Sequence, residues 1–169
     1  NMFTGLWNIL TNPSKVSTNY FAVGGYAATF LNMGLVGLAC LLLFLVFRGT
    51  PNNVSTLGFL LTLGFCSWGI NILNMWPSIF GVMIYGLVKK EKQGSLVNAM
   101  LFSTGIAPII SEMLLRYPNA DTVGFNLLGL FLALAVGIIA ITTAVRLITA
   151  LIRVYKKAEK GSIYHHSIK

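Results

Sequence analysis

The sequence predicts an all-α polytopic membrane protein with about four transmembrane spans, two of them built from discontinuous helices. Only 9% of its 169 residues are charged and 56% are hydrophobic, whereas about 25% of residues are charged in an ordinary soluble domain. Four stretches without Asp, Glu, Lys or Arg are each long enough for a span of about 20 residues. Two of these stretches contain proline together with asparagine or glycine, which a continuous lipid-facing helix does not need.

The first predicted element is a short amphipathic helix within residues 1–19. Its large apolar side chains fall on one helical face, at Phe3, Leu6, Trp7 and Leu10. A helix with such a face is typical of a segment in the membrane interface, and a short core-packing helix is an equally good interpretation. Turn-forming residues follow and separate it from the first long span.

The first span covers residues 20–47. Gly24, Ala28 and Asn32 lie four residues apart and therefore form one stripe on its N-terminal half. Small residues allow close helix packing, and an asparagine in an apolar environment needs a hydrogen-bonding partner. We expect this stripe to pack against protein, with a solute contact at Asn32 as the alternative.

The second apolar stretch, residues 57–88, is too long for one straight crossing. Its 32 residues would form a helix of about 48 Å, against a hydrocarbon core of about 30 Å. Pro77 is the natural break, because proline clashes with a preceding helical turn and is favoured at the first position of a new helix. A second, shorter helix is therefore predicted to start at Pro77.

Polar groups gather at this predicted break. Asn71 and Asn74 precede Pro77, and the N–H of Ser78 has no acceptor within the new helix. The positive end of the helix dipole adds positive potential at the same place. The sequence therefore predicts a polar site near the middle of the membrane. In the alternative interpretation these groups satisfy one another and only stabilise a kink.

The third span, residues 96–115, contains a second interruption. Gly105 and Pro108 break its helical pattern, and Ser103 and Thr104 bring hydroxyl groups to the same place. We expect these residues to line a solute path together with those of the first break.

Glu112 is the one acidic residue in the predicted spans. It has two interpretations, an ion pair with Arg116 one turn later or an intramembrane carboxylate that couples transport to protons or cations.

The fourth span, residues 124–145, carries small residues on one stripe and is predicted to continue as a helix into a basic region. The basic residues at 89–92 and in the tail at 153–169 favour a cytoplasmic position for both, with residues 20–152 as the transmembrane domain. This predicts four crossings with both chain ends in the cytoplasm. A re-entrant helix at 77–88 would change that count.

Several function classes are disfavoured. The spans contain no His and no Asp, so they lack the residues for a metal site, a nucleophile with its base or a pair of carboxylates. No phosphate-binding glycine loop predicts a cofactor. Although the net charge is +8, the basic residues flank apolar spans and are not interleaved with exposed aromatic residues, so no nucleic acid is expected as a partner.

Three stretches of the chain carry a family resemblance. "GLWNILTNPSKVSTNYFAVGGYAATFLNMGLVGL", "GINILNMWPSIFGVMIYGLV" and "LFSTGIAPIISE" resemble repeated stretches of a bacterial multi-pass membrane family catalogued as domain of unknown function 1576. The resemblance covers about the first 115 residues. It implies proteins roughly twice this long with two related halves, in a bacterial cell membrane, and it names no substrate.

These observations favour a transporter or channel for a small solute whose path lies at the two broken helices. Its expected partners are membrane lipid and a second copy or second half of the chain. A scaffold or partner subunit that transports nothing is the main alternative, and a membrane-embedded enzyme is the third.

Overall fold

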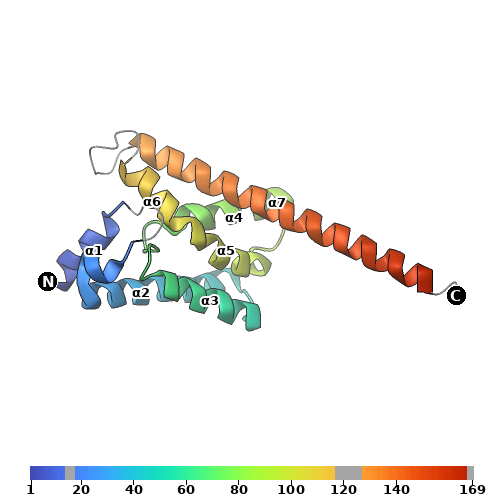
Figure 1. The fold of residues 1–169 in the computed structure, drawn as a ribbon, viewed down its shortest axis with the longest axis horizontal. Helices are drawn as coiled ribbons and strands as arrows, with labels where there is room; N and C mark the ends of the chain where they lie inside the picture. Colours follow the sequence, from blue (N-terminus) through green and yellow to red (C-terminus); the bar gives the residue numbers. More distant parts are fainter. Residues whose placement is uncertain (14–17, 117–126, 167–169) are drawn as a thin grey trace.

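The structure is a computed structural model that describes residues 1–13, 18–116 and 127–166 (Figure 1). Throughout these ranges the chain forms helices joined by turns, which confirms the all-α fold class. The elements are α1 (Met2–Leu10), α2 (Tyr20–Phe47), α3 (Asn53–Phe65), α4 (Trp76–Lys89), η1 (Gln93–Leu96), α5 (Val97–Ser103), η2 (Thr104–Ile106), α6 (Ala107–Arg116) and α7 (Leu127–His166). Three segments are long and apolar enough to cross a membrane, Tyr20–Phe47, Gln93–Arg116 and Leu127–Lys157. They indicate an integral membrane protein.

Helix α2 has the predicted bounds and one break that the sequence did not reveal. The Asn19 side chain caps its start by accepting from the N–H of Phe21 at 3.0 Å, and Arg48 ends it in the left-handed conformation. Inside the helix, Gly25 has φ +77° and ψ 173°, which separates the first turn from the rest. Glycine is needed at this position because residues with a side chain rarely adopt that conformation.

Helix α1 packs against the first turns of α2. Gly5 and Ile9 are buried in this contact, and a Cβ atom at Gly5 would overlap the carbonyl oxygen of Gly24. Gly24, a small residue of the predicted stripe, therefore allows close helix packing, as expected. On the outer side of α1, Phe3 is 68% exposed and Trp7 is 61% exposed.

The predicted second span consists of two helices, α3 and α4, which run in opposite directions as a hairpin, with α5 packed against both (Figure 1). At its open end, the Ser55 hydroxyl near the start of α3 donates to Asn98 Oδ1 at 2.7 Å. The Gln93 side chain, just after α4, donates to the Met83 carbonyl at 3.0 Å. A Cβ atom on Gly94 would lie 2.6 Å from the carbonyl oxygen of Phe47, the last residue of α2. The start of α3, the end of α4 and the end of α2 therefore lie together.

The closed end of the hairpin points toward the start of α2. There the N–H of Tyr20 donates to the Ser67 carbonyl at 3.0 Å, and the N–H of Thr18 donates to the Trp68 carbonyl at 3.2 Å. Helix α1 and the C-terminal end of α7 lie at opposite ends of the described structure (Figure 1). Four crossings with both chain ends in the cytoplasm stay a prediction, whereas three helical segments of the described residues are long and apolar enough to cross a membrane.

The remaining helices pack on the hairpin. The segment from α5 to α6 runs away from its open end, with the three residues of η2 in its middle. Helix α7 packs against α4 and α6. A Cβ atom on Gly137 would lie 3.0 Å from the Pro77 backbone, so the predicted small-residue stripe of α7 meets the start of α4. As predicted, α7 continues past residue 145 into the basic region, and it extends beyond the other helices (Figure 1).

Candidate functional site

The candidate site is the segment of residues 66–75 between α3 and α4, here called the tip segment. Its backbone leaves the helical path for ten residues, and Gly69 adopts a φ of +136°. Such a break exposes several backbone N–H and C=O groups that no helix satisfies. In an apolar environment each unsatisfied group costs several kcal/mol, on the order of 2–7. The partners of these groups therefore decide what the site can do.

Asn71 and Asn74 bond to each other across a tight turn. The backbone N–H of Asn71 donates to Asn74 Oδ1 at 2.8 Å, and the backbone N–H of Asn74 donates to Asn71 Oδ1 at 2.9 Å. Asn71 Oδ1 also accepts from the N–H of Leu73 at 2.9 Å. The two side chains thus satisfy the N–H groups that precede α4, as the interpretation of a kink-stabilising pair predicts.

The amide nitrogens of the same two residues tie the tip segment to three other elements. Asn71 Nδ2 donates to the Tyr20 hydroxyl at 3.1 Å and, at a longer 3.5 Å, to the carbonyl of Ile9 at the end of α1. Asn74 Nδ2 donates to Ser111 Oγ on α6 at 2.7 Å. These bonds connect the tip segment to α1, α2 and α6.

Asn74 and Tyr20 share an acceptor in the tip segment. Asn74 Nδ2 donates to the Gly69 carbonyl at 2.8 Å, and the Tyr20 hydroxyl donates to the same carbonyl at 3.0 Å. Both lone pairs of that oxygen are therefore used.

Asn32 holds the other half of the tip segment from the middle of α2. Its Nδ2 donates to the carbonyls of Ile70 at 2.9 Å and Cys66 at 3.3 Å. Its Oδ1 accepts from the N–H of Ile72 at 3.3 Å. The side chain is fully buried, so this asparagine supplies the partners of three backbone groups, the carbonyls of Cys66 and Ile70 and the N–H of Ile72.

The start of α4 follows the predicted pattern. Pro77 lies in the first turn of α4, and the Ser78 hydroxyl donates to the Met75 carbonyl at 2.9 Å. Both residues are buried. The helix therefore begins where the proline predicts, whereas the preceding helix ends much earlier than expected, at Phe65.

The second predicted break is milder. Ser103 Oγ donates to the Met100 carbonyl and Thr104 Oγ1 to the Leu101 carbonyl, both at 2.7 Å and both to an α5 carbonyl one turn earlier. Pro108 lies in the first turn of α6, partly buried. The chain changes to a 3₁₀ turn and then continues as a helix, so little backbone needs an outside partner.

The two breaks nevertheless lie side by side. Thr104 Oγ1 is 3.3 Å from Thr62 Oγ1 on α3, and Ser111 on α6 receives the bond from Asn74. The structure thus brings together Asn32, Asn71, Asn74 and Ser78 around the tip segment and places Thr104 next to it. The Ser103 hydroxyl bonds within its own helix, and Glu112 forms an ion pair with Arg116, whose Nε lies 3.3 Å from Glu112 Oε1.

Sequence reasoning missed three residues of this site. These are Tyr20, Thr62 and Ser111, whose hydroxyl groups bond to or lie beside the residues of the two breaks. A tyrosine in the first turn of an otherwise apolar helix is a usable signal, because a buried tyrosine hydroxyl needs a polar partner. The Ile9 carbonyl carries no side-chain signal at all.

Comparison with protein-family models assigns the chain to a family. Residues 1–156 match the family described as "Protein of unknown function (DUF1576)". The chain belongs to this family. The match extends about forty residues past the stretch that carries the sequence resemblance, and it includes both breaks of the DUF1576 chain and most of α7. No curated protein and no solved structure matches the chain.

Proposed function

We propose that this DUF1576 chain forms one part of a membrane transporter or channel for a small solute, with the tip segment on the solute path. The observation that carries the proposal is the hairpin α3–α4, whose closed end is non-helical backbone inside the apolar body of the protein. Irregular backbone at membrane depth is tolerated only where it is buried in protein or lines a watery cavity. Discontinuous helices of this kind hold the solutes in many transporters.

The distribution of charge supports an orientation for this arrangement. The basic residues that flank the open end of the hairpin are Arg48, Lys89, Lys90 and Lys92, and the C-terminal part of α7 extends from the same end (Figure 1). Under the positive-inside rule this end faces the cytoplasm. The proposed topology has three crossings, at α2, at α5–α6 and at α7, with α3–α4 as a re-entrant hairpin that enters from the cytoplasmic side.

A second copy, or a second half of a longer chain, would complete the path. The tip segment presents Trp68 and Leu73, which are 54% and 40% exposed, next to its buried asparagines. Large apolar side chains at a polar turn are suited to contact another protein surface. Two hairpins that meet at their tips would enclose a space between them near the middle of the membrane.

Glu112 is the proposed coupling residue. One of its carboxylate oxygens lies near Arg116, and the other, Oε2, is buried without a hydrogen-bond partner in the part of the chain that the structure describes. A buried acceptor without a partner is rare and can bind a proton or a cation. Because Ser111 is its neighbour in sequence and bonds to Asn74, a change at Glu112 would reach the tip segment through α6.

Water access at the tip segment tests the proposal without knowledge of the solute. In a background where Cys40 and Cys66 are replaced by alanine, Ser67→Cys should react with a small water-soluble thiosulfonate reagent in proteoliposomes. Leu38→Cys, on the exposed apolar face of α2, is the matched control and should stay unreactive. Reaction at position 67 should also stop the flux of any solute found in a transport screen. Equal reactivity at the two positions would contradict a water-filled path at the tip.

One observation favours a second candidate, a membrane scaffold or partner subunit. The amide groups of Asn32, Asn71 and Asn74 all bond within the protein. A scaffold would need nothing more from these residues. For this candidate, thiol reagents should reach neither the tip segment nor the face of α2, and no solute of the screen should be transported.

A further inference from the structure

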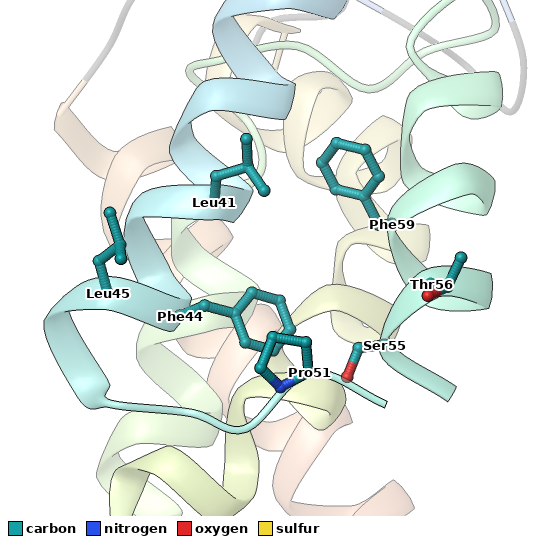
Figure 2. A pocket seen from close by; sticks show the side chains of 7 residues that line it. All are labelled: Leu41, Phe44, Leu45, Pro51, Ser55, Thr56 and Phe59. Atoms are coloured by element: carbon teal, nitrogen blue, oxygen red, sulfur yellow. The ribbon is translucent and has the colours of Figure 1, made fainter. Parts of the chain in front are cut away.

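An apolar groove runs along the outer surface between α2 and α3. Its first part has a volume of about 440 Å³ and lies among Leu41, Phe44, Leu45, Pro51 and Phe59 (Figure 2). A second part of about 430 Å³ continues along the same two helices toward Gly34. Because Leu41 and Phe59 line both parts, we treat them as one groove.

Glycine residues on α2 keep the groove open. A Cβ atom at Gly34 would meet no other atom within 4 Å, so the space beside it is empty. At Gly37 a Cβ atom would lie 3.1 Å from the Leu63 side chain, which shows that α2 and α3 touch there and close the floor. A groove that is apolar along its length and open beside Gly34 fits an extended hydrocarbon chain.

The length of the groove matches one leaflet of a bilayer. From Gly34 to Leu45 the helix rises about 16 Å, and half of a hydrocarbon core of about 30 Å is about 15 Å. The groove ends at Pro51, on the connection that carries Arg48. Arg48 is exposed, and the lysines that follow α4 lie at the same end of the molecule. The apolar slot therefore opens at a basic surface.

We propose that the groove binds one acyl chain of an anionic phospholipid from the leaflet at the basic end, with the lipid phosphate at Arg48. The acyl chain would fill the space beside Gly34 and Leu41 and gain dispersion contacts with both helices. Arg48 would bind the phosphate oxygens through its planar guanidinium, and the lysines would raise the local concentration of anionic lipid. This inference does not depend on whether the protein transports a solute.

Native mass spectrometry of the full chain tests the proposal with two lipids of identical acyl chains, phosphatidylglycerol and phosphatidylcholine. The unmodified protein should retain a phosphatidylglycerol molecule about fivefold more tightly than phosphatidylcholine, since one basic residue near the membrane surface contributes about 1 kcal/mol. Equal retention of the two lipids would overturn the assignment of the phosphate to Arg48, and this comparison needs no variant.

Matched variants separate the chain from the headgroup. Gly34→Leu should fill the groove and weaken retention of both lipids, whereas Gly64→Leu, also exposed and also with open space at its Cβ, should change neither. Arg48→Asn keeps a residue that tolerates the left-handed conformation and should lower phosphatidylglycerol retention to the level of phosphatidylcholine. Arg153→Asn on α7 is its control. Equal effects of the two glycine variants, or a change in oligomeric state with Gly34→Leu instead of lipid loss, would contradict the proposal.

Discussion

The two interrupted helices of this protein look alike in sequence and differ in structure. Each combines a proline with nearby polar residues, at Pro77 and at Pro108. Between α3 and α4 the chain leaves the helix for ten residues and reverses direction, and three buried asparagines supply the missing hydrogen bonds. Between α5 and α6 it forms a 3₁₀ turn of three residues and continues onward.

The kind of polar side chain near each proline accounts for the difference. Asparagine both donates and accepts through a rigid amide, so it can replace the two partners of a non-helical backbone unit. Serine and threonine hydroxyls instead bond back to carbonyls one turn earlier, as Ser103 and Thr104 do, and this keeps the helix intact. Asparagines before a membrane proline therefore indicate a true reversal, and hydroxyls indicate a local tightening.

The largest effect is expected for Asn74→Ala. It removes three hydrogen bonds, to Gly69, Ser111 and the N–H of Asn71, and leaves buried groups without partners. At about 1–3 kcal/mol for each such group, the free energy of unfolding should fall by about 4 kcal/mol or more. Chemical denaturation in mixed micelles measures this change. A loss below about 1 kcal/mol would mean that the tip segment does not depend on its asparagines.

A smaller but still large effect is expected for Asn32→Ala, on the order of 3 kcal/mol, because Cys66, Ile70 and Ile72 lose their partner. Asn98→Ala is its control at the open end of the hairpin. Ser55 loses Asn98 as an acceptor there but keeps its hydrogen bond to Asn52. We expect about 1 kcal/mol or less there. Similar losses for both variants in the same denaturation assay would show that the closed end is no more dependent on its asparagine than the open end.

At the milder break, Ser103→Ala should lower the free energy of unfolding by less than about 1 kcal/mol. Its hydroxyl donates to the Met100 carbonyl, which has a second lone pair for a hydrogen bond within the helix. Loss of the hydroxyl therefore leaves no buried donor without an acceptor. The apparent melting temperature in detergent measures this. A decrease as large as that of Asn74→Ala would remove the distinction between the two breaks.

The sequence predicts the features that depend on local signals and misses those that depend on contacts between distant residues. The bounds of α2 and the start of α4 follow from local signals, the run of apolar residues and Pro77. The early end of α3 at Phe65 does not, because residues 66–75 are themselves mostly apolar. They are held out of a helix by Asn32, which is 34 residues from Cys66 along the chain. The direction of the hairpin likewise depends on contacts between distant residues, such as Ser55 with Asn98.

The smallest effect on stability is expected for Glu112→Gln. Its ion pair with Arg116 is about a quarter to a third exposed, and such pairs contribute about 0–1 kcal/mol. The free energy of unfolding should therefore hardly change, whereas the dependence of flux on a proton or cation gradient should disappear if Glu112 couples transport. A variant that keeps this dependence would leave the residue with only its ion pair.

The central claim is that α3 and α4 form a hairpin, so that the start of α3 and the end of α4 lie at the same membrane surface. Single cysteines at Thr50 and Glu91, both exposed, test it most directly in a background without Cys40 and Cys66, with Asn8→Cys on α1 as the reference for the other surface. A membrane-impermeant maleimide added to one side should label positions 50 and 91 together, and added to the other side it should label position 8. Labelling of positions 50 and 91 from opposite sides would contradict the hairpin and restore a single broken crossing.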